Sequence, residues 1–307
     1  MPVEGHAGLT VSSSKLQLVE IIKRGDQFLL ENIDEAFFTE SINFESDKDS
    51  KISSMFQGAF NDLAIRKSLL SSTVSFTLPF ELFYIYQIPY DNTMLHTDLI
   101  EEFRFHFSLL YPFSPVKDLA MQYIEADKGN YSEINTAIVI ALQRRYLMLL
   151  EKFCRQNSLR LKFVDNIHTA SERALSVSQP VTEQNLVLSV WFNNKYLSVI
   201  YSSFGRMIYF KVIPVTDASE ISAYLERETK PGGFLKIEKN QIDAAYLCGE
   251  DIPLSVAETL RKVLKLNFIH FNPFVNLLPG PGIFKNRNFT DRANSFSAAA
   301  GIAIRTS

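Results

Sequence analysis

Short apolar runs separated by polar breaks open the chain, over residues 8–38. The runs "LTV", "KLQLVEII" and "QFLLENIDEAFF" are interrupted first by "SSS" and then by "KRGD". Apolar alternation between turn residues is typical of β-strands, so this segment predicts an antiparallel meander, with Gly25 in a turn that needs a positive φ. After a polar loop at 45–51, Phe56, Phe60 and Leu63 recur at helical spacing and predict a helix with one buried face.

Residues 73–165 predict a self-contained α+β block. Strands are expected in "STVSFTLPFELFYIYQIPY", bent at Pro79, and in "DLAMQYIEAD", "INTAIVIAL" and "RLKFVD". Two helices are expected between them, and Asp98 is a candidate N-cap of the first. Their apolar stripes are Leu99, Phe103, Phe107 and Leu110 in the first helix and Tyr146, Leu149, Leu150 and Phe153 in the second. The order β-β-α-β-β-α-β is that of a small sandwich with helices on one sheet face.

The strand-turn-strand pattern of the N-terminus returns in the second half, in "NLVLSVWFNNKYLSVIYSSFGRMIYFKVIPV". Thr10 to Gly25 spans fifteen positions, and Ser189 to Gly205 spans sixteen. Such a repeat indicates an internal duplication. A helix from Asp217, a strand "DAAYLCG", a helix over 254–264 and a C-terminal helix "RANSFSAAAGIAIR" are expected to follow.

Composition narrows the classes of protein that this pattern fits. The chain has 307 residues, 46% of them hydrophobic and 21% charged, with a net charge of −3. These values predict a globular protein without the basic field that nucleic-acid binding needs. The two cysteines, Cys154 and Cys248, favour reduced thiols in the cytoplasm over a disulfide framework. The N-terminus has no signal-peptide pattern and no apolar run is long enough to span a membrane, so we expect a cytoplasmic protein without direct membrane insertion.

Five stretches together resemble the actin-like ATPase superfamily, in the branch of the type IV pilus protein PilM and of FtsA. They are "GLTVSSSKLQLVEI", "SFTLPFELFYIYQIPYDN", "LIEEFRFHFSLLYPFSPVKDL", "NLVLSVWFNNKYLSVIYSSFGRMIYFKVIPV" and "FSAAAGIAIR". The sequence also looks like an uncharacterised Bacteroidetes family described only as having an actin-like ATPase fold. The resemblance implies an α/β fold, a duplicated ribonuclease H-like core with a small inserted α+β sandwich. It divides the chain into a first lobe (1–72), an insert (73–165), a return helix and linker (166–183), a second lobe (184–285) and a C-terminal helix (286–307).

The resemblance also implies where a nucleotide would bind, and this chain departs from the pattern there. In the first turn of PilM-like proteins an Asp, a Gly and a Lys stand where this chain has Thr10, Ser12 and Gln17. Ser13 and Ser14 complete the turn. Ser189 and Trp191 are expected at the Asp and Gly of the second turn, and near the adenine a Gly-Gly pair is reduced to Gly249, between Cys248 and Glu250.

These departures remove the groups that Mg²⁺ and phosphate need. Mg²⁺ is bound through one or two carboxylates, and glycine lets the backbone approach a phosphate closely. We therefore expect a degenerate nucleotide site with no metal, no cofactor and no catalytic residue. The alternative is a divergent ATPase that binds ATP and Mg²⁺ through other residues, such as Glu250 and Asp251.

Other candidate sites are weaker. The three serines fit a plain hairpin turn better than an anion site, and "KPGGF" at 230–234 lacks the spacing of a phosphate loop. The five histidines are scattered, and no pair of His or Cys has metal-ligand spacing. Glu101 and Glu102 are neighbours on a helix and do not face each other.

The remaining hypothesis is a scaffold that binds a protein partner. In PilM-like proteins the insert and the first lobe form a groove for a partner segment, and the resemblance implies the same here. Aromatic side chains are enriched in binding hot spots, and the insert concentrates them, although they are also what a compact core contains. The candidate partner surface consists of Phe80, Phe83, Tyr84, Tyr86, Tyr111 and Phe113.

Overall fold

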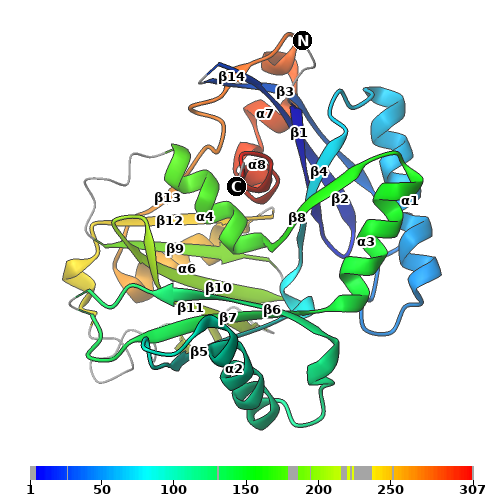
Figure 1. Ribbon diagram of the computed structural model, residues 1–307. Helices are drawn as coiled ribbons and strands as arrows, with labels where there is room; N and C mark the ends of the chain where they lie inside the picture. Colours follow the sequence, from blue (N-terminus) through cyan, green and yellow to red (C-terminus); the bar gives the residue numbers. More distant parts are fainter. Residues whose placement is uncertain are drawn as a thin grey trace.

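Within the described residues, the computed structural model contains three β-sheets (Figure 1). The described residues are 5–25, 27–129, 131–178, 186–193, 195–215, 220–221, 223–224, 237–250 and 252–305. The predicted helix from Asp217 and the "KPGGF" segment lie largely or wholly outside them.

The first lobe is built on a six-stranded sheet with the order β14-β3-β2-β1-β4-β8. The pairs β1–β2 and β2–β3 are antiparallel, as the meander predicted, while β4 runs parallel to both β1 and β8. Figure 1 shows α1 and α3 side by side against this sheet, and the predicted stripe of α1 is buried. The elements are β1 (Gly5–Val11), β2 (Lys15–Arg24), β3 (Gln27–Phe37), α1 (Asp49–Arg66), β4 (Thr73–Leu78), α3 (Arg144–Gln156), β8 (Arg160–Asn166) and β14 (Leu278–Pro279).

The second lobe repeats this arrangement. Its sheet has the order β11-β10-β9-β12-β13, which matches β3-β2-β1-β4-β8 strand for strand. Its first three strands are antiparallel, and β12 runs parallel to β9 and β13. Gly25 and Gly205 occupy the same turn of the two lobes with φ of 62° and 75°, so the predicted duplication is confirmed. The elements are β9 (Val187–Phe192), β10 (Tyr196–Ser203), β11 (Arg206–Pro214), β12 (Ala244–Gly249), α6 (Leu254–Leu264) and β13 (Phe268–His270).

A three-stranded antiparallel sheet, ordered β5-β7-β6, forms the insert. Helix α2 covers one face of it through Leu99, Phe103 and Phe107. The opposite face packs against the second lobe, where Gln87 Nε2 donates to the Ile208 carbonyl at 2.9 Å and the Asp127 amide donates to the Met207 carbonyl at 2.8 Å. The elements are β5 (Phe83–Pro89), α2 (His96–Leu110), β6 (Leu119–Ala126) and β7 (Thr136–Gln143).

Two details of the insert differ from the sequence-based expectation. Residues 73–165 do not form one separate block, because β4 and β8 pair into the first lobe's sheet and α3 packs on that lobe. Asp98 does not cap α2: the cap residue is Leu95 and Asp98 lies in the first turn. An acidic side chain there still stabilises the helix through its dipole.

Two helices cross between the lobes, α4 (Ile167–Ser178) and α8 (Ser297–Ala303), and Figure 1 shows α8 between the two large sheets. The predicted C-terminal helix is shorter than expected, because a 3₁₀ turn at Ala293–Phe296 precedes α8. Gly301 permits the crossing: a Cβ there would lie 1.7 Å from the Ala170 carbonyl oxygen of α4. The short helix α7 (Arg287–Thr290) leads into this region.

Candidate functional site

Strand register shows which residues of the two lobes are equivalent. Thr10 pairs with Gln17 of β2 and Thr77 of β4, and Trp191 pairs with Ser198 of β10 and Cys248 of β12. In both lobes the partner in the hairpin lies seven residues further along. Trp191 is therefore the structural counterpart of Thr10, whereas Ser189 was expected in that place.

Thr10 has no carboxylate, and its hydroxyl oxygen already accepts a hydrogen bond. The side chain is buried, and the hydroxyl of Thr77 donates to Thr10 Oγ1 at 2.7 Å. This bond joins β1 to β4 inside the sheet. The position at the end of β1 thus contributes to strand pairing rather than offering a ligand to a metal ion.

The three serines after β1 form a hairpin turn, and their polar groups are hydrogen-bonded within the turn and to nearby backbone. The Ser12 amide donates to the Lys15 carbonyl at 3.0 Å, and Ser12 Oγ accepts the amides of Ser14 and Lys15 at 3.3 and 3.2 Å. The carbonyls of Ser13 and Ser14 accept the amides of Ile42 and Phe38, at 2.7 and 2.8 Å. A phosphate loop needs amides that point at the ligand. Two of these amides are instead directed at a hydroxyl and one at a carbonyl.

Trp191 is buried between the lobes. Its ring meets Phe80 edge to face with 5.2 Å between centroids, and Phe80 also contacts Tyr196 at 6.1 Å. Phe80 follows β4 of the first lobe, in the 3₁₀ turn at Phe80–Leu82, while Trp191 and Tyr196 belong to β9 and β10. Phe80 is therefore part of an interlobe core and not of an open partner surface.

An ionic cluster joins the lobes beside the serine turn. The Lys15 side chain is only 3% exposed, and its Nζ lies 3.2 Å from Glu35 Oε2 and 3.9 Å from Glu250 Oε2. Gln17 Nε2 donates to Glu35 Oε2 at 3.3 Å, and Arg292 pairs with the other oxygen of Glu35. Burial alone would raise the pKa of Glu35, but Arg292 and Lys15 outweigh it and lower that pKa.

Sequence reasoning missed this cluster except for Gln17 and Glu250. Glu35 and Arg292 are 257 positions apart, and no spacing rule relates them. The available signal was Lys15 itself, a charged residue at the start of a strand whose next seven residues are mostly apolar.

Position 249 at the end of β12 has no room for a side chain. The φ of Gly249 is 148°, and a Cβ there would lie 2.0 Å from the Phe192 carbonyl oxygen of the adjacent strand. Cys248 Sγ contacts the Val190 carbonyl at 3.6 Å and is buried. Asp251, the other acid of the alternative metal site, lies outside the described residues.

The side chains at this position do not fit Mg·ATP. Thr10 and Trp191 replace the carboxylates expected at the two turns, and Glu250 faces the ammonium of Lys15. Among the described residues there is no group of three or more His, Cys, Asp or Glu that could hold a metal ion. In the same part of the chain, no helix is long and apolar enough to cross a membrane.

Ser189 belongs to a buried polar network between the second sheet and α4. His168 of α4 contacts Ser189 Oγ through Nε2 at 2.9 Å and Ser198 Oγ through Nδ1 at 2.7 Å. Burial lowers the pKa of His168 to about 3, so its ring is neutral at physiological pH. The network fastens α4 to β9 and β10.

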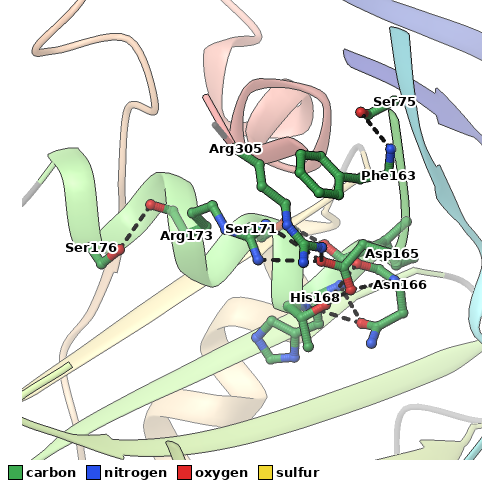
Figure 2. Close-up of polar contacts among 11 residues, drawn as sticks. Ser75, Phe163, Asp165, Asn166, His168, Ser171, Arg173, Ser176 and Arg305 are labelled. Carbon is green, nitrogen blue, oxygen red and sulfur yellow. Dashed lines mark hydrogen bonds and ion pairs between the residues drawn. The ribbon is translucent and has the colours of Figure 1, made fainter. Parts of the chain in front are cut away.

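Figure 2 shows how α4 is also fastened to the first lobe. The carboxylate of Asp165, near the end of β8, forms ion pairs with Arg173 of α4 at 3.3 Å and with Arg305 at 3.2 Å. Arg305 also lies 4.2 Å from the centre of the Phe163 ring, and Asp165 Oδ1 accepts the Thr169 hydroxyl at 2.5 Å. The Asp165 carboxylate therefore joins α4 to the segment that follows α8.

Of the remaining predicted partner-surface residues, only Phe113 is open to solvent, at 101% exposure. Tyr86 is buried and donates to the Phe103 carbonyl at 2.8 Å. Phe83, Tyr84 and Tyr111 are partly buried, and Tyr84 packs on Tyr111 with 4.9 Å between ring centroids. The predicted surface is therefore mostly the core of the insert.

Several exposed apolar side chains lie in the second half of α2 and in the loop that follows it. We call them the α2 patch: Phe105, Leu109, Leu110 and Phe113, each more than half exposed. Phe105 and Leu109 fall outside the stripe that faces the sheet, and this excess of apolar residues was a signal available in the sequence. Leu110, which was predicted to lie on the buried stripe, is exposed.

Comparison with known proteins supports the fold. No protein-family model and no curated protein matches the sequence. A solved PilM–PilN type IV pilus biogenesis complex contains a similar chain, with a TM-score of 0.75, 15% identity and 98% of both chains covered. A Bacteroides thetaiotaomicron protein with an actin-like ATPase fold and unknown function matches at 0.55, with 9% identity over 98% of this chain and 96% of that one. The ethanolamine utilization protein EutJ from Carboxydothermus hydrogenoformans matches at 0.50, with 7% identity over 99% and 90%.

These similarities agree with the two matched sheets, the insert after β4 and the helices between the lobes. The chain has the fold of the actin-like ATPase superfamily.

Proposed function

We propose that this protein is a non-catalytic, PilM-like scaffold that binds a protein partner in the cytoplasm and does not turn over nucleotide. The observation that carries the proposal is the pair of equivalent strand ends, Thr10 and Trp191. One is a buried threonine bonded to Thr77, and the other is a buried indole packed on Phe80.

The physical argument concerns both metal and phosphate. Mg²⁺ needs carboxylate ligands besides phosphate oxygens and water, and neither strand end supplies one. The nearby carboxylates of Glu35 and Glu250 already face Lys15, and Arg292 also binds Glu35. Recruiting them to a metal would leave the buried Lys15 ammonium poorly compensated, which is costly.

A protein partner is supported by two observations. One similar solved structure is described as a complex of PilM with PilN. The α2 patch is also a group of large apolar side chains without cover in the described part of the chain. Exposed apolar groups of this kind mark interaction sites in soluble proteins.

The nucleotide part is tested by thermal unfolding with and without Mg·ATP. A ligand at a hundred times its dissociation constant adds about 2.7 kcal/mol to the free energy of unfolding, which gives a clear shift. We expect no shift for the wild type. The double variant Thr10→Asp with Trp191→Gly restores a carboxylate and removes the indole, and is expected to gain a shift that requires Mg²⁺. A wild-type shift of that size would instead support the divergent ATPase.

The partner part is tested with Phe105→Ser combined with Phe113→Ser. Both side chains are exposed, so the free energy of unfolding should change by no more than about 0.5 kcal/mol per site. Once a native partner has been isolated, we expect its affinity to fall about tenfold or more, as at other aromatic hot spots. Ile65→Ser is the matched control, because Ile65 is an exposed apolar residue of α1. Equal affinity for wild type and double variant would exclude the α2 patch as the binding site.

A further inference from the structure

A cavity of about 220 Å³ lies between α4 and the second sheet. The residues that form it come from the middle and end of α4, the start of β9, the end of β10 and the turn into β11. This is the end of the second sheet opposite the β9–β10 turn, so the cavity is separate from the position expected for a nucleotide. The lining residues are Thr169, Glu172, Arg173, Leu175, Ser176, Val187, Ile200, Ser202, Gly205 and Met207.

One buried carboxylate oxygen in the cavity has no hydrogen-bond partner in the described part of the chain. Oε1 of Glu172 is shielded from solvent and has no hydrogen-bond partner within the residues that the structure describes. Arg173 also lines the cavity, and its guanidinium is paired with Asp165 at 3.3 Å (Figure 2). A buried carboxylate oxygen that is left unpaired is costly, so Glu172 favours a ligand that brings a hydrogen-bond donor and positive charge.

The walls restrict the size and shape of such a ligand. Leu175, Val187, Ile200 and Met207 give the cavity an apolar lining, while Thr169 and Ser202 add hydroxyl groups. The volume is below the range of about 300–1,000 Å³ that drug-sized ligands occupy. A straight alkyl chain of four or five carbons that ends in an ammonium group matches both the apolar walls and the acidic group.

The turn from β10 to β11 borders the cavity at Gly205. Phe204 has φ of 48° although it is a bulky residue, and it is 61% exposed beside Gly205. Phe204 and Gly205 form the two-residue turn of the β10–β11 hairpin, which requires a positive φ at both positions. The exposed Phe204 ring offers an apolar contact next to the cavity.

We propose that this cavity binds an alkylammonium group, with Glu172 as its counter-ion. The group comes either from a lysine of a partner protein or from a small free amine, since both present the same chemistry. A lysine would place its neighbouring residues at the rim, against Phe204. The site requires no nucleotide and does not involve the α2 patch.

The test is a titration of the full chain, followed by NMR, with n-butylammonium and with N-acetyl-lysine methylamide. We expect saturable binding of both, and Glu172→Gln is expected to weaken it about tenfold or more, because a charge-assisted hydrogen bond is lost. Ser202→Leu fills part of the cavity and should also weaken binding if the glutamine variant folds poorly. Glu151→Gln changes an exposed acid of α3 and should leave the affinity within about twofold of wild type.

Two comparisons identify the source and decide the claim. Tighter binding of the lysine derivative than of butylammonium supports a partner's lysine, and the reverse supports a free amine. The Nε-acetylated lysine derivative, which is neutral, should not bind. Absence of saturable binding, or equal affinity for wild type and Glu172→Gln, would overturn the proposal. Neither result says whether Mg·ATP binds. This inference can therefore be wrong while the proposed function is right, and the reverse.

Discussion

At the scale of single residues, a few buried polar groups decide how the lobes meet. Lys15 lies between Glu35 of its own lobe and Glu250 of the other, and all three side chains are at most 18% exposed. Removing one partner from a buried ion pair leaves an uncompensated charge, which is far more costly than loss of an exposed pair.

We therefore expect Lys15→Met to lower the free energy of unfolding by about 3 kcal/mol. Lys51→Met is the matched control, because Lys51 also pairs with two carboxylates, Glu40 and Asp47, but on the surface. The control should cost much less, because solvent screens an exposed ion pair. Urea unfolding of the two variants measures both values, and equal costs would show that the Lys15 cluster does not stabilise the interlobe contact.

Glu172 gives the protein a distinctive pH dependence. Burial raises the pKa of Glu172 to about 7, and the nearby Ser189 hydroxyl only partly opposes the shift. Two titratable groups near it stay neutral in this range: burial lowers the pKa of His168 to about 3 and raises that of the Cys248 thiol.

The folded state consequently binds a proton at Glu172 that the unfolded state has released between about pH 4.5 and 7. Stability contributed by this group is present at low pH and is lost as pH rises through 7. Glu172→Gln removes that loss, so the variant should become more stable than wild type at pH 8, by up to about 3 kcal/mol, while differing little at pH 5. Unfolding midpoints across this pH range measure the effect. A constant difference between the two proteins would contradict the assignment.

At the scale of elements, the crossing of α4 and α8 is the tightest contact in the interlobe region. Gly301→Ala places a methyl group against the Ala170 carbonyl, so we expect a loss of about 3 kcal/mol in the free energy of unfolding. Gly58→Ala in α1 meets no atom within 4 Å and should instead add about 0.5–1 kcal/mol. Chemical denaturation compares the two, and similar effects would mean that α8 can move away from α4.

The elements were largely predictable because their periodicity follows from local packing. The stripe of Phe56, Phe60 and Leu63 and the bounds of α6 were read from spacing alone. The strand partners were harder to predict, because periodicity does not say which sheet a strand joins. For this reason β4 and β8 were predicted to belong to the insert, whereas they pair within the sheet of the first lobe. The ionic cluster depends on contacts between residues more than two hundred positions apart, which no local pattern contains.

At the scale of the whole molecule, contacts of several kinds connect the lobes. Phe80 packs on Trp191, the insert sheet packs on the second lobe through β11, and Lys15 pairs with Glu250. Nucleotide-driven switches need lobes that move relative to one another, with a ligand that binds one arrangement better. In this protein aromatic packing and ion pairs connect the lobes directly, which agrees with the proposed role as a support for a partner.

Trp191 is the only tryptophan in the chain, so its fluorescence reports on this interlobe contact directly. The most direct measurement is its emission during a titration with Mg·ATP, with the heat of binding recorded by calorimetry on the same samples. The account predicts no saturable heat and an unchanged emission maximum. Saturable binding of Mg·ATP accompanied by a shift in Trp191 emission would contradict it.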